Sequence, residues 1–191
     1  MKKSIGAQTI VFPTPVFIVG SYDKKGQANM MNAAWGGICS SVPPSVSVSI
    51  RPARYTYQNI IQKKAFTVNI PSTKYIKEAD YFGIASGKKE NKLKKAELTA
   101  IKSDIVDAPY IKEFPFILEC ALLKTLEVGA HTIFVGEIKD IKVDENCLNE
   151  KGQPDMEKIK PFSFDPATGR YFEIGKYLAN AFSVGLSIQK E

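Results

Sequence analysis

The chain has 191 residues, a net charge of +6 and a pI of about 9.1, and this length is enough for one domain with a sizeable core. Hydrophobic residues make up 44% and charged residues 24%, as in ordinary globular proteins, and the lack of any apolar run of about 18 residues excludes a membrane span. The apolar stretch after Met1-Lys2-Lys3 is interrupted by Pro13 and Pro15, so we expect no signal peptide, a cytoplasmic location and a single domain over residues 1–191.

The first half of the chain reads as short strands joined by turns. Gly26 can supply the positive φ of a turn after the first strand, and the Ser45–Ile50 stretch alternates polar and apolar residues, the period of a half-buried strand. The predicted strands are Val11–Tyr22 (interrupted by prolines), Gln27–Trp35, Ser45–Arg51 and Phe66–Ile70.

Two short helices are predicted beside these strands. Thr56 is placed to cap a helix that ends near Lys63 and Lys64, whose charges suit a helix C-terminus. Ser72 is placed to cap a second helix over Thr73–Phe82.

The second half adds further strands around a lysine-rich segment. The predicted strands are Ile117–Thr125, Thr132–Val143, Pro161–Phe164 and Tyr171–Ile174. Residues 86–109 are expected to be irregular, and residues 147–161 to form a polar loop that could cover a groove. At least six strands with short connecting helices favour a mainly β, closed barrel over an open sheet, and no Gly-x-Gly-x-x-Gly turn supports a doubly wound nucleotide fold.

Few residues are available for metal or thiol chemistry. The three cysteines, Cys39, Cys120 and Cys147, have no zinc or redox spacing, and their odd number argues against a disulfide framework. His131 is the only histidine, which excludes a multi-histidine site, and we predict no metal.

The positive charge does not by itself predict a nucleic-acid partner. The lysines are spread along the chain, and the densest run, residues 88–95, is typical of a solvated loop and helix face. A narrower interpretation is that one or two of these lysines contact a phosphate group. We expect no nucleic acid and no membrane as partners.

The most informative segment is Asn29–Trp35. Small residues there lie beside two asparagines and one indole, between the Gly26 turn and a Gly36-Gly37 break that precedes Pro43-Pro44. Such a segment lets a flat ligand approach the backbone while the amides hydrogen-bond it. Two amides this close together are disfavoured in a strand, which favours a functional interpretation.

The ordered set of segments from about Pro15 to Ile174 resembles the flavin reductase-like, FMN-binding split-barrel family, most closely its flavoredoxin branch. The resemblance implies a six-stranded Greek-key split β-barrel, a homodimer, and FMN in a groove at or near the subunit interface. The matching stretches are Pro15–Ser21, Asn29–Trp35, Pro43-Pro44, Thr56–Ile60, Phe66–Pro71, Ala79–Gly83, Ser86-Gly87, Leu118–Cys120 and Gly129–Ile138.

FMN needs three environments, and the matched segments can supply them. For the isoalloxazine ring the candidates are Asn32, Ala33, Ala34 and Trp35. For the ribityl chain they are Ser49 and Asn69, and for the phosphate they are Arg51, Arg54, Thr56 and, at a greater distance, Lys92. Asn29, Met31, Ile50 and Asn59 are further cofactor-binding candidates. Taken singly, Trp35 could be a core aromatic residue, Ser49 the outward face of a strand, and Arg51 a strand end.

His131 is the candidate catalytic residue. It follows Gly129-Ala130 at a strand start, where a side chain can overhang a groove, and the resemblance places a histidine here near the flavin. It would position a nicotinamide or a proton donor, while the flavin carries the hydride chemistry.

The resemblance implies an FMN-binding oxidoreductase that passes electrons from NADH or NADPH through FMN to a flavin or another acceptor. The first alternative is a flavoredoxin-type electron carrier that has no nicotinamide site and exchanges electrons with a redox partner protein. A second alternative is a non-enzymatic module, either for flavin storage or for nucleic-acid binding, and the latter would show affinity that falls steeply with salt.

Overall fold

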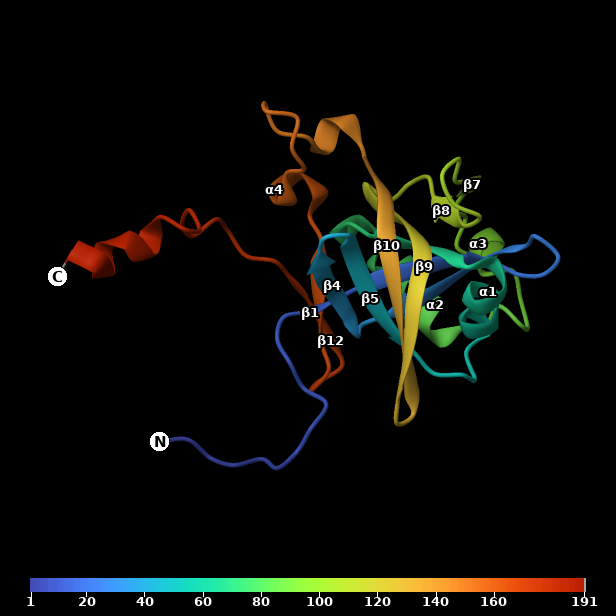
Figure 1. The fold of residues 1–191 in the computed structure, drawn as a ribbon, viewed down its shortest axis with the longest axis horizontal. Helices are drawn as coiled ribbons and strands as arrows, with labels where there is room; N and C mark the ends of the chain where they lie inside the picture. The colour runs from blue at the N-terminus through green and yellow to red at the C-terminus, as the bar shows by residue number, and fades with distance from the viewer. Residues whose placement is uncertain (191) are drawn as a thin grey trace.

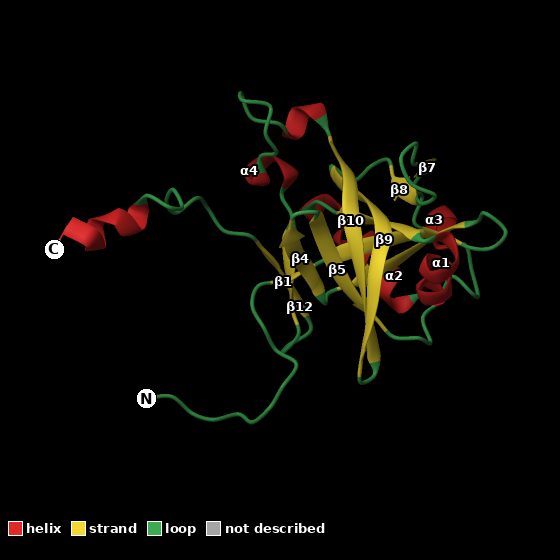
Figure 2. Cartoon of the chain, in the orientation of Figure 1, coloured by secondary structure: helices red, strands yellow, loops and turns green. Residues whose placement is uncertain are grey.

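The computed structural model describes residues 1–190 as a β-rich body from which both chain ends project (Figures 1 and 2). The strands are β1 (Thr14–Pro15), β2 (Phe17–Tyr22), β3 (Ala28–Ala33), β4 (Gly36–Ser41), β5 (Pro44–Ile50), β6 (Ala65–Ile70), β7 (Ala100–Lys102), β8 (Pro109–Ile111), β9 (Phe116–Val128), β10 (His131–Val143), β11 (Phe162–Asp165) and β12 (Arg170–Glu173). The helices are α1 (Tyr55–Lys63), α2 (Ile76–Ile84), α3 (Lys92–Lys95) and α4 (Met156–Ile159), with the 3-10 turns η1 (Thr73–Tyr75), η2 (Glu145–Cys147) and η3 (Val184–Lys190).

The main sheet has seven strands in the order β3-β2-β6-β9-β10-β5-β4, and every neighbouring pair is antiparallel. Two smaller sheets accompany it, β1-β11-β12 and β7-β8. The long β9–β10 hairpin crosses the front of the molecule in Figure 1, and α1, α2 and α3 lie at the end opposite the projecting termini.

The sheet closes into a barrel because β3 and β4 are two halves of one bent strand. β3 pairs with β2, and β4, which begins only three residues later, pairs with β5. At the bend the backbone N–H of Ser49 donates to the carbonyl of Trp35 at 2.8 Å. Counting the bent strand once gives a six-stranded barrel, so the prediction of a mainly β, six-stranded barrel is confirmed.

The prediction that Gly36-Gly37 interrupts the strand structure is wrong, since these residues begin β4. The reason for glycine is close packing. A Cβ on Gly36 would lie 2.4 Å from the carbonyl oxygen of Ser47 on the paired strand, so only glycine lets β4 approach β5 here.

Two hydrophobic cores hold the body together. The first fills the barrel and contains Val48, Phe66, Val68 and Phe134. The second lies between the outer face of the barrel and α2, around Phe82. Because β6 faces both cores, its residues are buried on both sides, and the polar Thr67 and Asn69 are enclosed as well.

Both predicted helix caps are wrong. α1 begins at Tyr55, two residues before the Tyr57 start that a Thr56 cap would give, and no side chain among the described residues caps it. Thr56 instead lies buried inside the helix. Ser72 precedes η1 without a capping hydrogen bond, and α2 begins only at Ile76.

The two segments predicted to lack regular structure contain short elements. α3 and β7 lie within residues 86–109, and a bridge between Leu148 and Pro154, followed by α4, lies within residues 147–161. These elements have four residues or fewer, too short for a periodic signal. Across the described residues, none of the helices has the length and apolarity needed to cross a membrane.

Candidate functional site

The bend between β3 and β4 places Trp35 beside the first residue of β10. The ring centroids of Trp35 and His131 are 4.8 Å apart and tilted by 52°. Across the β5–β10 pair, Thr132 is opposite Ile50, which brings His131 next to Arg51, and the Arg51 Nε lies 3.4 Å from the His131 Nε2. Three candidate residues from separate segments therefore meet at one end of the barrel.

Positive charge gathers at this end, and no carboxylate within residues 1–190 pairs with it. Arg51 and Arg54 flank a turn in which the Arg54 N–H donates to the Arg51 carbonyl at 3.0 Å. Neither arginine forms an ion pair within residues 1–190. Burial, followed by the charges of Arg51 and Arg54, lowers the pKa of His131 below its usual value. The site therefore favours an anion.

A buried amide cluster continues from Arg54 into α1. The Asn29 Nδ2 donates to the Thr56 Oγ1 at 2.9 Å, and the Asn59 Nδ2 donates to the Ser21 Oγ at 3.2 Å. Asn29 is 5% exposed, yet its Oδ1 has no hydrogen-bond partner among the described residues. A buried acceptor left unpaired is costly, so this oxygen is suited to receive a donor from a ligand.

Gly87 packs against this cluster and could not carry a side chain. A Cβ there would lie 2.1 Å from the Asn29 Oδ1 and 3.0 Å from the Tyr55 ring. The close approach explains why a glycine follows Ser86 at this position.

Lys92 is buried near Arg54 and does not lie on the surface of this end of the barrel. Its side chain is 5% exposed, and its ammonium donates to the carbonyls of Phe82 and Ala85 at 3.0 and 3.1 Å. Burial lowers the pKa of Lys92 to about 8, with Glu90 opposing the shift and Arg54 adding to it. Lys92 thus caps the C-terminal end of α2 and contributes charge from below.

Asn32 faces a different neighbourhood. Its Nδ2 donates to the carbonyl of Ala79 on α2 at 2.9 Å. The hydroxyl of Tyr171 lies nearby and donates to Asp80 at 2.9 Å. Burial and then Asp80 raise the pKa of Tyr171 to about 12. Asn32 therefore links the bent strand to α2 and to the sheet that contains β12.

The remaining candidates divide by burial. Met31, Ala34 and Ser49 are half-buried beside the bend, whereas Ala33 and Ile50 are buried in the barrel core. The structure does not bring Asn69 to this end. Its Nδ2 donates to the Ile18 carbonyl and the Thr67 Oγ1, and its Oδ1 accepts from the Ile111 N–H.

Sequence reasoning missed three contributors: Ser21, Tyr55 and Gly87. Ser21 accepts the Asn59 amide, and Tyr55 anchors the cluster by donating to Asp23 at 2.8 Å. Only the matched Ser86-Gly87 pair gave a signal for Gly87, and nothing in a single sequence ties Ser21 to Asn59.

The residues that meet here fit FMN. Two arginines without carboxylate partners suit a phosphate, an unpaired buried oxygen suits a ribityl hydroxyl donor, and the Trp35 and His131 rings suit a flat heterocycle. The guanidinium groups and Trp35 are solvent-exposed, so a ligand can reach them, whereas the Asn29 Oδ1 is buried in this structure.

Comparison with known proteins agrees with this geometry. A family model described as "Flavin reductase like domain" matches residues 9–159. Flavoredoxin of Desulfovibrio vulgaris (Miyazaki F) is 50% identical, with a TM-score of 0.94 over 97% of this chain and 100% of that chain. A protein with a split barrel domain from Shewanella frigidimarina NCIMB 400 is 22% identical, with a TM-score of 0.80 over 89% of this chain and 86% of that chain. This match shows similarity of fold only. An uncharacterized protein of Archaeoglobus fulgidus is 36% identical over 146 residues, which are 76% of this chain and 80% of that protein.

Proposed function

The chain belongs to the flavin reductase-like domain family, as its sequence predicts, and we propose that it is a single-domain FMN-binding oxidoreductase that takes electrons from NADH or NADPH. The observation that carries the proposal is the meeting of Arg51 and Arg54, both without a carboxylate partner in residues 1–190, with the unpaired Asn29 Oδ1 and the Trp35–His131 pair.

Each part of the site has a proposed task. Arg51 and Arg54 bind the phosphate, and the Asn29 Oδ1 accepts a hydrogen bond from a ribityl hydroxyl. Trp35 and His131 hold the isoalloxazine ring. Bound FMN would supply the hydride and electron chemistry, and the protein supplies orientation.

The other residues near the bend have supporting tasks. Met31, Ala34 and Ser49 line the approach to the ring, and Asn32 supports the bent strand through its hydrogen bond to the Ala79 carbonyl. Thr56 and Asn59 act indirectly, because their hydrogen bonds fix Asn29 and Ser21. Lys92 adds positive potential from beneath Arg54. Asn69, Ala33 and Ile50 have no place in this site, because their side chains are enclosed in the cores.

We further propose that the protein works as a homodimer. The ring-binding end is open, with Trp35 37% exposed, and a second subunit would close it. Excluding water there would strengthen the electrostatic interactions with the phosphate and the ring.

A second candidate function is electron transfer without a nicotinamide site. It is favoured by the 50% identity to a flavoredoxin over nearly the whole chain. In this case the FMN would exchange electrons with a redox partner protein.

A visible absorption spectrum of the purified protein, reconstituted with FMN, followed by anaerobic addition of NADH and then NADPH, tests both functions. Flavin bands that bleach rapidly support the reductase and identify its donor. Flavin bands that persist support the electron carrier. Absence of bound flavin after reconstitution overturns both. His131→Gln, which keeps the proposed Arg51 and Arg54 contacts to the phosphate, should retain FMN while nicotinamide-dependent bleaching slows.

A further inference from the structure

The C-terminal arm, residues 175–190, extends away from the body (Figure 1). Its hydrogen bonds within the described residues are local, such as Val184 N–H to Asn180 carbonyl and Leu186 N–H to Ser183 carbonyl. Large apolar side chains are nevertheless exposed along its length; they are Tyr177, Leu178, Phe182, Val184, Leu186 and Ile188. An arm of this composition is unfavourable in water unless another surface covers it.

Phe182 combines two unfavourable features. Its side chain is fully exposed, at 101%, and its backbone has φ = +61°, a region that residues other than glycine rarely occupy. Nothing in the body contacts this ring to compensate. The conformation would be favoured if the ring were inserted into a partner surface.

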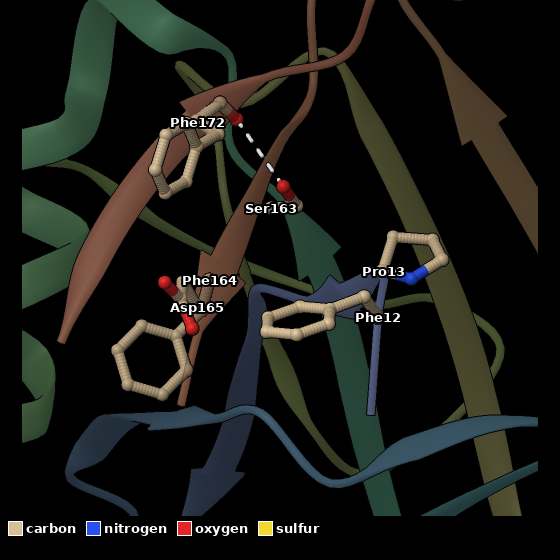
Figure 3. Close-up of a pocket in the computed structure, with 6 residues that line it drawn as sticks. All are labelled: Phe12, Pro13, Ser163, Phe164, Asp165 and Phe172. Carbon is tan, nitrogen blue, oxygen red and sulfur yellow. Dashed lines mark hydrogen bonds between the residues drawn. The ribbon is translucent and has the colours of Figure 1, made fainter. Parts of the chain in front are cut away.

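A pocket that is apolar, like the exposed side chains of the arm, lies where the arm leaves the body (Figure 3). It has a volume of about 420 Å³ and is lined by Phe12, Pro13, Ser163, Phe164, Asp165 and Phe172. Its polar groups already have partners. The Ser163 Oγ donates to the Phe172 carbonyl, and the Asp165 Oδ1 accepts from the N–H groups of Ala167 and Thr168. The pocket therefore favours an aromatic or aliphatic occupant over a polar one.

The position of the pocket indicates where such an occupant would come from. β12 carries Phe172 and leads directly into the arm, so each arm departs beside its own pocket. In a two-fold dimer the same surface of both subunits meets at the axis, so a dimer formed through this face would place each arm next to the pocket of the other subunit. Residues 175–183 can span at most about 30 Å when extended, enough to cross to a neighbouring subunit.

We propose that two copies of this chain exchange their C-terminal arms, with Phe182 of one copy filling the Phe12–Phe164–Phe172 pocket of the other. This inference rests on the homodimer proposed above and names the surfaces that form it. The pocket is linked to the bent strand, because Phe164 packs on Tyr171, whose hydroxyl lies near Asn32.

Sedimentation of full-length Phe182→Asp tests the role of the aromatic side chain. The charged variant should raise the dimer dissociation constant at least tenfold over wild type. Val42→Asp is the matched control, because Val42 is another highly exposed apolar residue (88%), in the β4–β5 turn, and this variant should dimerise as wild type does. A Phe182→Asp dimer as tight as wild type, or a wild-type chain that is monomeric at micromolar concentration, would overturn the proposal. Thermal unfolding checks that the variant remains folded.

Cross-linking between two differently tagged chains tests the exchange directly. One chain carries Phe182→Cys and the other Phe172→Cys, both with Cys39→Ser because Cys39 is the exposed native thiol. Mild oxidation should give a disulfide-linked heterodimer carrying both tags, and replacing Phe172→Cys by Val42→Cys should abolish it. Absence of the heterodimer refutes the exchange. FMN absorbance is measured on the same samples, so that failure to bind flavin is separated from failure to exchange arms.

Discussion

The Arg51 Nε lies 3.4 Å from the Nε2 of His131, and this pairing determines the state of the imidazole. A guanidinium can only donate hydrogen bonds, so Nε2 must present its lone pair and the proton of the neutral ring must lie on Nδ1. The lowered pKa of His131 favours this neutral form. In that form His131 offers its Nδ1–H to a ligand.

Arg51→Met should raise the pKa of His131. Burial and the Arg51 and Arg54 charges all disfavour the imidazolium, so removing one guanidinium favours the protonated form. Because the chain has one histidine, its imidazole resonances can be followed by NMR titration without ambiguity. Lys151→Met, an exposed change in the turn between η2 and α4, should leave the pKa where it is. An unchanged His131 pKa in Arg51→Met would show that the Arg51 charge does not act on the imidazole.

Arg54→Gln should weaken FMN binding about tenfold or more, as expected for a charge-assisted hydrogen bond to phosphate. Riboflavin has the same ring and ribityl chain without the phosphate, so its affinity should not change. Titrations of both flavins, followed by fluorescence, separate the two contributions. Equal losses for FMN and riboflavin would show that Arg54 contacts the ring or supports the fold. The wild-type preference for FMN should also diminish as salt is added.

Much of the fold is predictable from the sequence because its strands have strong local signals. The alternation in β5 and the apolar residues of β6 identify those strands before any partner is known. β4 was missed because Gly36 and Gly37 signal a break by propensity, while the close approach to Ser47 that requires Gly36 is a tertiary contact. The Thr56 cap failed for a similar reason, since the hydroxyl is directed to Asn29 instead of to its own helix.

The sequence singles out Arg51, Arg54, Trp35 and Asn29 as candidates for the site, but it does not show which of the buried amides keeps an atom without a partner. Asn29 and Asn69 look alike in sequence, as amides within strands. Only the structure separates them, because all the amide atoms of Asn69 have partners in the core whereas the Asn29 Oδ1 has none among the described residues.

Thr56→Val should lower the free energy of unfolding by about 1–3 kcal/mol, because the substitution leaves the buried Asn29 amide without its acceptor. Thr125→Val, an exposed change on β9, is the matched control and should be close to neutral. Urea unfolding of the FMN-free proteins measures both. In a double-mutant cycle with Asn29→Ala the two losses should not add, because the residues share one hydrogen bond, and additive losses would contradict the assigned pairing.

Lys92 should make the FMN-free protein more stable as pH rises from about 8 to about 10.5. Its pKa is about 8 in the folded protein and 10.5 when it is exposed, so between these values the unfolded chain binds more protons than the folded one. Stability increases with pH wherever that is so. Below pH 8 both states carry the charge, and the folded state bears the full cost of burying it. A shift of this size corresponds to about 3 kcal/mol over the window.

Lys92→Met removes this titration. Between pH 8 and 10.5 the free energy of unfolding should therefore rise in wild type relative to the variant. Lys94→Met, an exposed change on the same short helix, should follow the wild-type curve. Urea unfolding at pH 7, 8.5 and 10 provides the comparison. Parallel curves for wild type and Lys92→Met would mean that Lys92 keeps an ordinary pKa, with its hydrogen bonds to the Phe82 and Ala85 carbonyls offsetting the cost of burial.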